Sequence, residues 1–216
     1  KRVGQLTSHI DVLPTLLGLA GYDASARDQL GGQIPDQTYE PLPGADLSRV
    51  IHDPSLPVKN PDGRDRRGVL FMTDDTITQY LAGEDAPPAY EIFRQEVDAQ
   101  RKAGLNLTTG SVTEPCHIHC ARTEDWKLAK YWDPSNHAPN QWELYYLAED
   151  AYEQFNLVSW KDGEPVLEPS RIPTGWKLNC KQLAEALKTM RALLVELEKT
   201  YLGGPKPVTE PYTFDG

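Results

Sequence analysis

Cysteine is scarce in this chain, which has only Cys116, Cys120 and Cys180 among its 216 residues. So few cysteines cannot form the disulfide framework of a small secreted domain. Cys116 and Cys120 cannot bridge within one strand, because four extended residues separate their Cα atoms by ~13 Å and a disulfide tolerates about 7 Å at most. Cys180 can pair with either of them only through the fold. Cysteine content therefore assigns no redox compartment.

The chain also has fewer basic than acidic residues, and it has no long apolar run. The chain has 22 Lys and Arg against 32 Asp and Glu, a formal net charge of −10. This balance argues against a nucleic-acid partner, which requires a clustered basic surface. A bilayer span needs about 20 apolar residues, and no run reaches that length, so we expect no membrane partner. No apolar segment of a signal peptide follows Lys1 and Arg2.

Apolar residues and turn formers are plentiful by contrast. The hydrophobic content of 39% is sufficient for a core, in one domain or two small ones. Eighteen prolines and sixteen glycines predict a chain rich in loops. The sequence has no initiator Met and begins close to a predicted element, so we expect a fragment of a longer protein.

Residues 142–158, WELYYLAEDAYEQFNLV, predict a strand that continues into a short helix. Large apolar residues alternate over 142–146, the period-2 pattern of a strand. Asp150 lies three residues before Glu153, which is the spacing of a capping box. We therefore expect a capped helix from Asp150 that closes at Asn156.

Residues 8–21, SHIDVLPTLLGLAG, predict a helix with a strongly apolar face. With Asp11 at the N-cap, Pro14 falls in the first turn, where its missing N–H is not needed. Gly21 is the expected left-handed stop. The apolar face consists of Leu13, Leu16, Leu17 and Ala20. Such a face must lie against a larger body, so we expect a partner domain.

The remaining pattern predicts a second strand, a hairpin, three more helices and several loops. Gln182–Tyr201 is the clearest helix, with a stripe formed by Leu183, Ala186, Leu187, Met190, Leu193, Leu194 and Leu197. The other predicted elements are a short helix over 45–51, a loop over 53–67, a strand over 68–73, a helix over 90–103, a hairpin of 117–122 with 126–132, and a loop over 159–175.

In order and spacing these segments resemble the C-terminal portion of the sulfatases, formylglycine-dependent sulfate ester hydrolases of the alkaline-phosphatase-like superfamily. SHIDVLPTLLGLAG is similar to the helix that closes the family's catalytic domain, and LPGADL to the glycine segment that follows. ARTEDWKLAKYWD resembles the family's hairpin and WELYYLAEDAYEQFNL its terminal strand. The family usually has Asp after the Tyr and Pro-Gly before the Glu, where this chain has Tyr146 and Ala151-Tyr152.

The resemblance implies hydrolysis of a sulfate monoester by the full-length protein. The family's nucleophile is a formylglycine made from Cys or Ser in a C/S-x-P-x-R motif, and it acts beside a divalent cation, for which we expect Ca²⁺. None of the three cysteines has Pro at +2 and Arg at +4, and no Ser-x-Pro-x-Arg occurs. We therefore assign no catalytic residue and no metal ligand to this chain. Both are expected in a missing N-terminal part, and the chain alone is expected to be inactive.

Asp74 and Asp75 follow the predicted strand over 68–73. Such an aspartate pair opens the metal site of the superfamily, but there the motif starts the domain, and here it follows the helix over 8–21. Paired aspartates after a strand also commonly form turns and cap helices. We favour these structural roles and keep Asp74 and Asp75 as substrate-pocket candidates.

The segment Cys116-His117-Ile118-His119-Cys120 suggests a zinc site. On a strand, however, His117 and His119 point to one face and the cysteines to the other, so four ligands cannot converge. The histidines can instead border the substrate cleft, where a hydrogen-bond donor suits an anionic ester. The alternative is a histidine pair at the edge of the core.

We therefore predict an α+β fold, with a small antiparallel sheet packed against a C-terminal helix, and the terminal helix of a truncated α/β alkaline-phosphatase-like domain. The predicted domains are 1–52 as the end of the catalytic domain, 53–202 as the C-terminal subdomain and 203–216 as a tail.

The predicted function is that of the C-terminal part of a sulfatase-like hydrolase. Its expected partners are the missing catalytic domain and a sulfate ester. One alternative is a phosphate or phosphonate monoester hydrolase of the same superfamily. The other is a non-catalytic module that uses the sheet for ligand binding or homo-oligomer contacts.

Overall fold

The computed structural model divides the chain into two compact units, Lys1–Val69 and Leu70–Gly216. The described residues are 4–33, 41–74, 92, 95, 99, 102–104, 117–132 and 139–203. Together they form an α+β fold, as predicted.

The first unit is helical. It contains the 3₁₀ helix η1 (His9–Asp11) and the α-helices α1 (Val12–Leu19), α2 (Ala24–Gly31) and α3 (Ser48–His52). The helix predicted over 8–21 is therefore present as η1 and α1. Asp11 is the N-cap residue of α1, and Pro14 lies in the first turn. Gly21, with φ 89°, supplies the left-handed turn after the helix.

Helix α1 buries a proline and a threonine more fully than its leucines. Pro14 and Thr15 are its buried residues, and the Thr15 hydroxyl accepts a 3.0 Å hydrogen bond from the backbone N–H of Leu47. Leu13 and Leu16 are 52% and 60% exposed. The segment before α3 packs closely on η1: a Cβ on Gly44 would lie 1.9 Å from the carbonyl oxygen of Ile10. Only glycine fits there.

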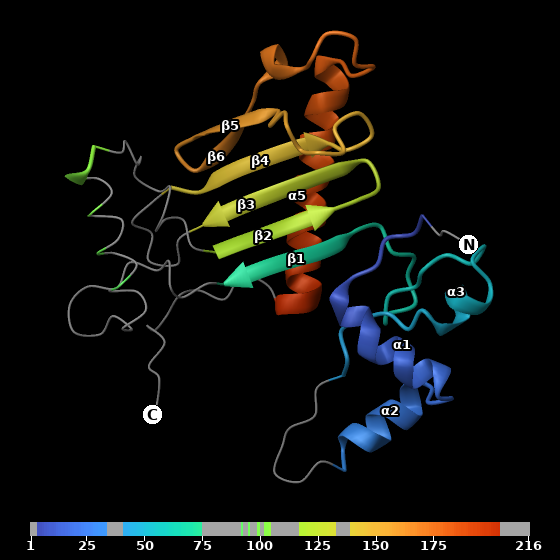
Figure 1. The fold of residues 1–216 in the computed structure, drawn as a ribbon. Helices are drawn as coiled ribbons and strands as arrows, with labels where there is room; N and C mark the ends of the chain where they lie inside the picture. Colours follow the sequence, from blue (N-terminus) through green and yellow to red (C-terminus); the bar gives the residue numbers. More distant parts are fainter. Residues whose placement is uncertain are drawn as a thin grey trace. The chain divides into compact units, whose positions relative to one another are not determined.

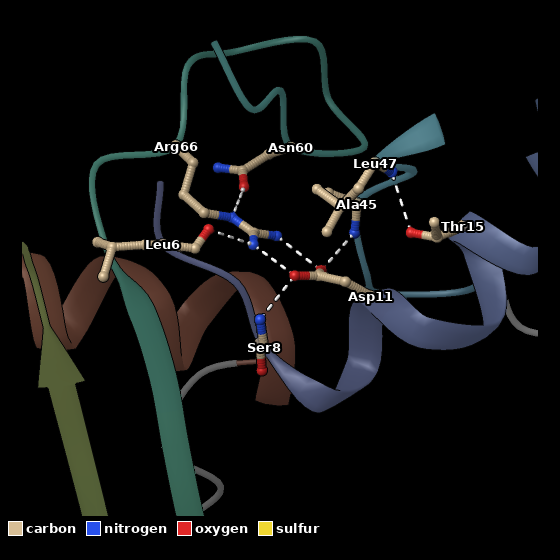
Figure 2. A network of polar contacts seen from close by, with 8 residues as sticks. All are labelled: Leu6, Ser8, Asp11, Thr15, Ala45, Leu47, Asn60 and Arg66. Carbon is tan, nitrogen blue, oxygen red and sulfur yellow. Dashed lines mark hydrogen bonds and ion pairs between the residues drawn. The ribbon is translucent and has the colours of Figure 1, made fainter. Parts of the chain in front are cut away.

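A buried ion pair connects separate segments of this unit (Figure 2). The guanidinium of Arg66 donates two hydrogen bonds to the Asp11 carboxylate, of 2.6 and 2.8 Å. The backbone N–H groups of Ser8 and Ala45 donate two more, of 2.7 and 2.8 Å. Both charged side chains are only 2% exposed. The bond from Ser8 completes the capping box of η1, whereas the carboxylate makes no capping hydrogen bond to α1. With four donors on its two oxygens, it has little capacity left for a metal ion.

The second unit is built on a four-stranded antiparallel sheet in the order β1-β2-β3-β4 (Figure 1). The strands are β1 (Val69–Asp74), β2 (His117–Arg122), β3 (Trp126–Trp132) and β4 (Gln141–Tyr146). Arg122 pairs with Lys127 across the turn between β2 and β3, and Leu128 pairs with Leu144 in β4. The predicted hairpin and the strand at 142–146 are both confirmed.

Helix α5 (Cys180–Leu202) covers one face of this sheet (Figure 1). Asn179 and Gln182 form a capping box at its start, and Gly203, with φ 73°, ends it. Six of the seven predicted stripe residues are buried: Leu183, Leu187, Met190, Leu193, Leu194 and Leu197. Each fully buried leucine stabilises the fold by about 1.5–3 kcal/mol relative to an exposed one, so this stripe fixes α5 on the sheet.

The short helix predicted from Asp150 is wrong. The Asp150 carboxylate accepts 2.9 Å hydrogen bonds from the backbone N–H groups of Gln154 and Phe155, and these close a loop. Glu153 adopts a left-handed φ of 56°, which a helix cannot contain, and its carboxylate pairs with Lys127. Asp150 and Glu153 have the spacing of a capping box, but the Glu153 side chain pairs with Lys127 instead of bonding back to Asp150. The Asp150 carboxylate therefore accepts hydrogen bonds from backbone N–H groups of a loop.

The loop predicted over 159–175 is also wrong in its first part. Strands β5 (Val158–Lys161) and β6 (Glu164–Leu167) form a hairpin there. Asp162 and Gly163 have φ of 53° and 79°, the primed two-residue turn that Asp-Gly favours. The many prolines and glycines of this segment led to the prediction of a loop instead of a hairpin. Trp142 donates a 2.8 Å hydrogen bond from Nε1 to the carbonyl of Gly163 and holds the hairpin to β4.

Several predictions fall mostly outside the described residues. Of the helix over 90–103, the structure describes only a few helical positions and Gly104, whose φ is 90°. The tail beyond residue 203 is not among the described residues. Cys120 and Cys180 are free thiols, and Cys116 lies outside the described range. Within that range, no helix combines the length and apolar content needed to cross a bilayer.

Candidate functional site

The two predicted histidines lie on the face of the sheet that α5 covers. His117 and His119 alternate with Ile118 along β2, so their side chains share a face. Both imidazoles contact the indole of Trp132, with ring-centroid distances of 4.8 and 5.6 Å. Trp132 pairs directly with His117 across the β2–β3 ladder. Each histidine is 8% exposed, so the pair forms a buried aromatic cluster.

His119 also contacts the last turns of α5. Its Nδ1 lies 2.7 Å from Oε1 of Glu198, and both side chains are about one-tenth exposed. A carboxylate at this distance accepts the Nδ1 proton and fixes the orientation of the imidazole. His119 therefore has the orienting partner that acid–base histidines require. The same contact ties β2 to α5.

The indole of Trp132 adds a donor to this cluster. Its Nε1 is buried and has no hydrogen-bond partner among the residues that the structure describes. Buried indole N–H groups usually find a partner. The Nζ of Lys130 lies 5.8 Å from the centroid of the same ring, a cation–π contact. Imidazole, indole and ammonium groups together make this end of the sheet rich in donors.

The aspartates are not brought into this cluster by the described structure. Asp74 is the last residue of β1, and its side chain, like all of Asp75, lies outside the described residues. Their role in a substrate pocket stays a prediction. Over the described ranges, no three His, Cys, Asp or Glu side chains come together as a metal site.

The opposite face of the sheet carries a second polar group. The Tyr131 hydroxyl donates a 2.9 Å hydrogen bond to the Glu143 carboxylate, and burial together with that carboxylate raises the pKa of Tyr131. Burial, and then Glu143, raise the pKa of Tyr145 to about 12. Burial likewise raises the pKa of the Cys120 thiol to about 11. Cys120 therefore stays a thiol near neutrality, faces away from the histidines and is a poor nucleophile or zinc ligand.

Sequence reasoning missed two charged residues that the structure shows to be central. Glu198 lies one turn after Leu194 on the apolar side of α5. A carboxylate in an apolar stripe indicates a buried polar partner, so this position could have been identified from the sequence. Arg66 lies in a charge-rich loop where no periodicity marks it. Its pairing with Asp11 came only from the fold.

Comparisons with known proteins give a weak structural likeness. No protein-family model matches the chain, and no curated protein matches it. Among solved structures, it is similar to BT4656, determined in complex with its substrate D-glucosamine-2-N,6-O-disulfate, with a TM-score of 0.44 and 18% sequence identity. That match covers 93% of this chain and 25% of the BT4656 chain. The chain thus spans about a quarter of the length of that protein.

Proposed function

We propose that this chain is the C-terminal part of a sulfatase-like hydrolase that cleaves sulfate monoesters as a full-length protein. The observation that carries the proposal is the order of four sequence segments: SHIDVLPTLLGLAG, LPGADL, ARTEDWKLAKYWD and WELYYLAEDAYEQFNL. Each segment alone is short, and together they follow the family's order from the closing helix of the catalytic domain to its terminal strand.

The contacts within these segments support the proposal. Asn156 closes the last segment by bridging β4 and β5: its Oδ1 accepts from the backbone N–H groups of Leu144 and Val158, at 3.0 and 3.1 Å. Asp11 in the first segment is the acceptor of the buried ion pair. Gly44 in the second segment lies where no larger residue fits. Residues that carry the resemblance thus make specific contacts within the fold.

Under this proposal the chain supports the reaction without performing it. The nucleophile and the ligands of a divalent cation, expected to be Ca²⁺, belong to the remainder of the protein. His117, His119, Asp74 and Asp75 are the candidates for contacts with the sulfate ester or its organic part. The exposed leucine face of α1 would pack against the catalytic domain, as expected for a helix that ends that domain.

Expression of the complete reading frame with a formylglycine-generating enzyme tests the proposal. The purified protein is assayed for release of sulfate, phosphate and phosphonate from matched aryl esters, and for sulfate release from sulfated monosaccharides. We expect sulfate release by the full-length protein and none by residues 1–216 alone. A higher kcat/KM for phosphate or phosphonate esters would favour the related hydrolases. No hydrolysis by a protein with verified formylglycine would favour a non-catalytic module.

A further inference from the structure

A hollow of about 400 Å³ lies in the second unit, away from the histidine cluster. It is formed by the turn between β2 and β3, the end of β4 and the first turns of α5. The less exposed residues of its lining, which we call its base, include Trp126, Tyr146 and Met190. Its size lies in the range of small-molecule sites in proteins.

The base of the hollow is aromatic and fixed in place. The rings of Trp126 and Tyr146 lie 4.7 Å apart at an interplanar angle of 32°, and the Trp176 ring meets Tyr146 edge-on at 6.1 Å. The backbone N–H of Trp126 donates a 3.0 Å hydrogen bond to the Thr123 hydroxyl. Both base rings are partly exposed, so they offer a preorganised apolar surface to a ligand.

The rim of the hollow consists of polar side chains that are exposed to solvent. Asp125, Lys177, Glu185 and Thr189 are exposed, and within residues 117–132 and 139–203 their side chains make no hydrogen bond or ion pair. These groups supply both donors and acceptors around the aromatic base. Two carboxylates against one ammonium give the rim a net negative charge, which disfavours an anionic ligand.

We infer that this hollow binds a neutral sugar ring. A pyranose has an apolar C–H face, which suits the Trp126 and Tyr146 rings, and hydroxyl groups at its edge, which suit the carboxylate and hydroxyl groups of the rim. Sulfated or phosphorylated sugars are disfavoured by Asp125 and Glu185. The inference goes beyond the proposed function and does not rest on it, because the hollow is formed by described residues of the second unit alone.

NMR titration of the ¹⁵N-labelled 216-residue chain tests this inference. The probes are methyl glycosides of glucose, galactose, mannose and N-acetylglucosamine, with glucose 6-sulfate and tetramethylammonium for comparison. The indole signal of Trp126 is assigned from the Trp126→Phe variant. We expect it to shift in a saturable manner with at least one neutral glycoside, and we expect glucose 6-sulfate and tetramethylammonium to bind less tightly than that glycoside.

Rim and control variants sharpen the outcome. Glu185→Ala and Thr189→Ala remove exposed groups and are expected to weaken binding by about five-fold each, the effect of losing one hydrogen bond. Trp160→Ala removes an exposed tryptophan of β5 and should leave the affinity unchanged. The inference is overturned if no neutral glycoside shifts the Trp126 signal, if either charged probe binds more tightly, or if the rim variants bind like the wild type.

Discussion

The two units of this protein differ in the side chains that they bury most deeply. In Lys1–Val69 the most deeply buried side chains include the charged pair Asp11 and Arg66, each 2% exposed, while Leu16 of α1 is 60% exposed. In Leu70–Gly216 the sheet and α5 enclose a core of leucines, with Leu128 and Leu144 fully buried. One unit is organised by directional hydrogen bonds and the other by apolar area.

The difference shows that the apolar residues of a helix need not form the core of its own unit. A buried ion pair contributes little net stability, because desolvation offsets most of the attraction, but it fixes which segments meet. In the first unit it joins η1, the loop at Ala45 and the segment at Arg66. This arrangement leaves Leu13, Leu16 and Leu19 of α1 exposed.

The largest expected effect is on the ion pair. Arg66→Met leaves the Asp11 carboxylate buried without its cation and should destabilise the first unit by about 3–5 kcal/mol. Hydrogen exchange of the Ala45 amide, which donates to Asp11, reports on this unit specifically. The matched control is Arg64→Met, which breaks an exposed pair with Asp62 and should cost about 1 kcal/mol or less. Equal losses in both variants would contradict the proposed role of Arg66.

The apolar core of the second unit is tested by Leu194→Ala in α5. Removal of this buried side chain should cost about 2–5 kcal/mol, because transfer and cavity effects add. Urea denaturation followed by near-UV tryptophan signals measures the loss. Val195→Ala is the control on the same helix, since Val195 is 60% exposed and should change stability by about 0.5 kcal/mol or less. A similar loss at both positions would mean that α5 does not pack as described.

A smaller effect is expected at Asp150, a buried carboxylate of the second unit. Its partners are two backbone N–H groups rather than a cation, so Asp150→Ala should cost about 1–2 kcal/mol, like the loss of a helix cap. Asp150→Asn retains an acceptor and should recover at least half of that loss. Exchange of the Gln154 and Phe155 amides locates the effect. No difference between the two variants would show that the carboxylate does not close this loop.

The smallest expected effect is the acid dependence of the first unit. Burial alone would raise the pKa of Asp11, but the Arg66 hydrogen bonds and the Ser8 and Ala45 N–H groups lower it below the usual 3.8. A carboxyl with a lowered folded-state pKa stabilises fully above its unfolded pKa, and this contribution is lost as pH falls from about 4 through the lowered value. Exchange of the Ala45 amide between pH 5 and 2.5 should show it. Arg66→Met should flatten this dependence, and an unchanged profile would contradict the assignment.

Much of the second unit could be predicted because its signals are local. Alternation defines β2, β3 and β4, and the apolar stripe defines α5 to within a few residues. The errors have physical causes. Asp150 and Glu153 have the spacing of a helix cap, but Glu153 takes a positive φ. The hairpin of β5 and β6 depends on a two-residue Asp-Gly turn within a segment whose prolines suggested a loop.

The candidate site was predictable only in part. Alternation placed His117 and His119 on one face of a strand, and nothing local to β2 indicated that the face is covered by α5. Asp74 is confirmed as the end of a strand, while its proposed contact with substrate stays a prediction, together with that of Asp75.

Periodicity and capping residues thus determined β2, β3, β4, α1 and α5 from the sequence alone, because each depends on neighbours within a few positions. The local signals did not yield α2 or the hairpin of β5 and β6. Tertiary structure alone decided the charged partnerships: Asp11 with Arg66 across 55 positions and His119 with Glu198 across 79. The physical reason is that a buried charge needs a partner of opposite charge or a hydrogen-bond donor or acceptor. Many groups along the chain could serve as that partner, and only the fold decides which of them lies close enough.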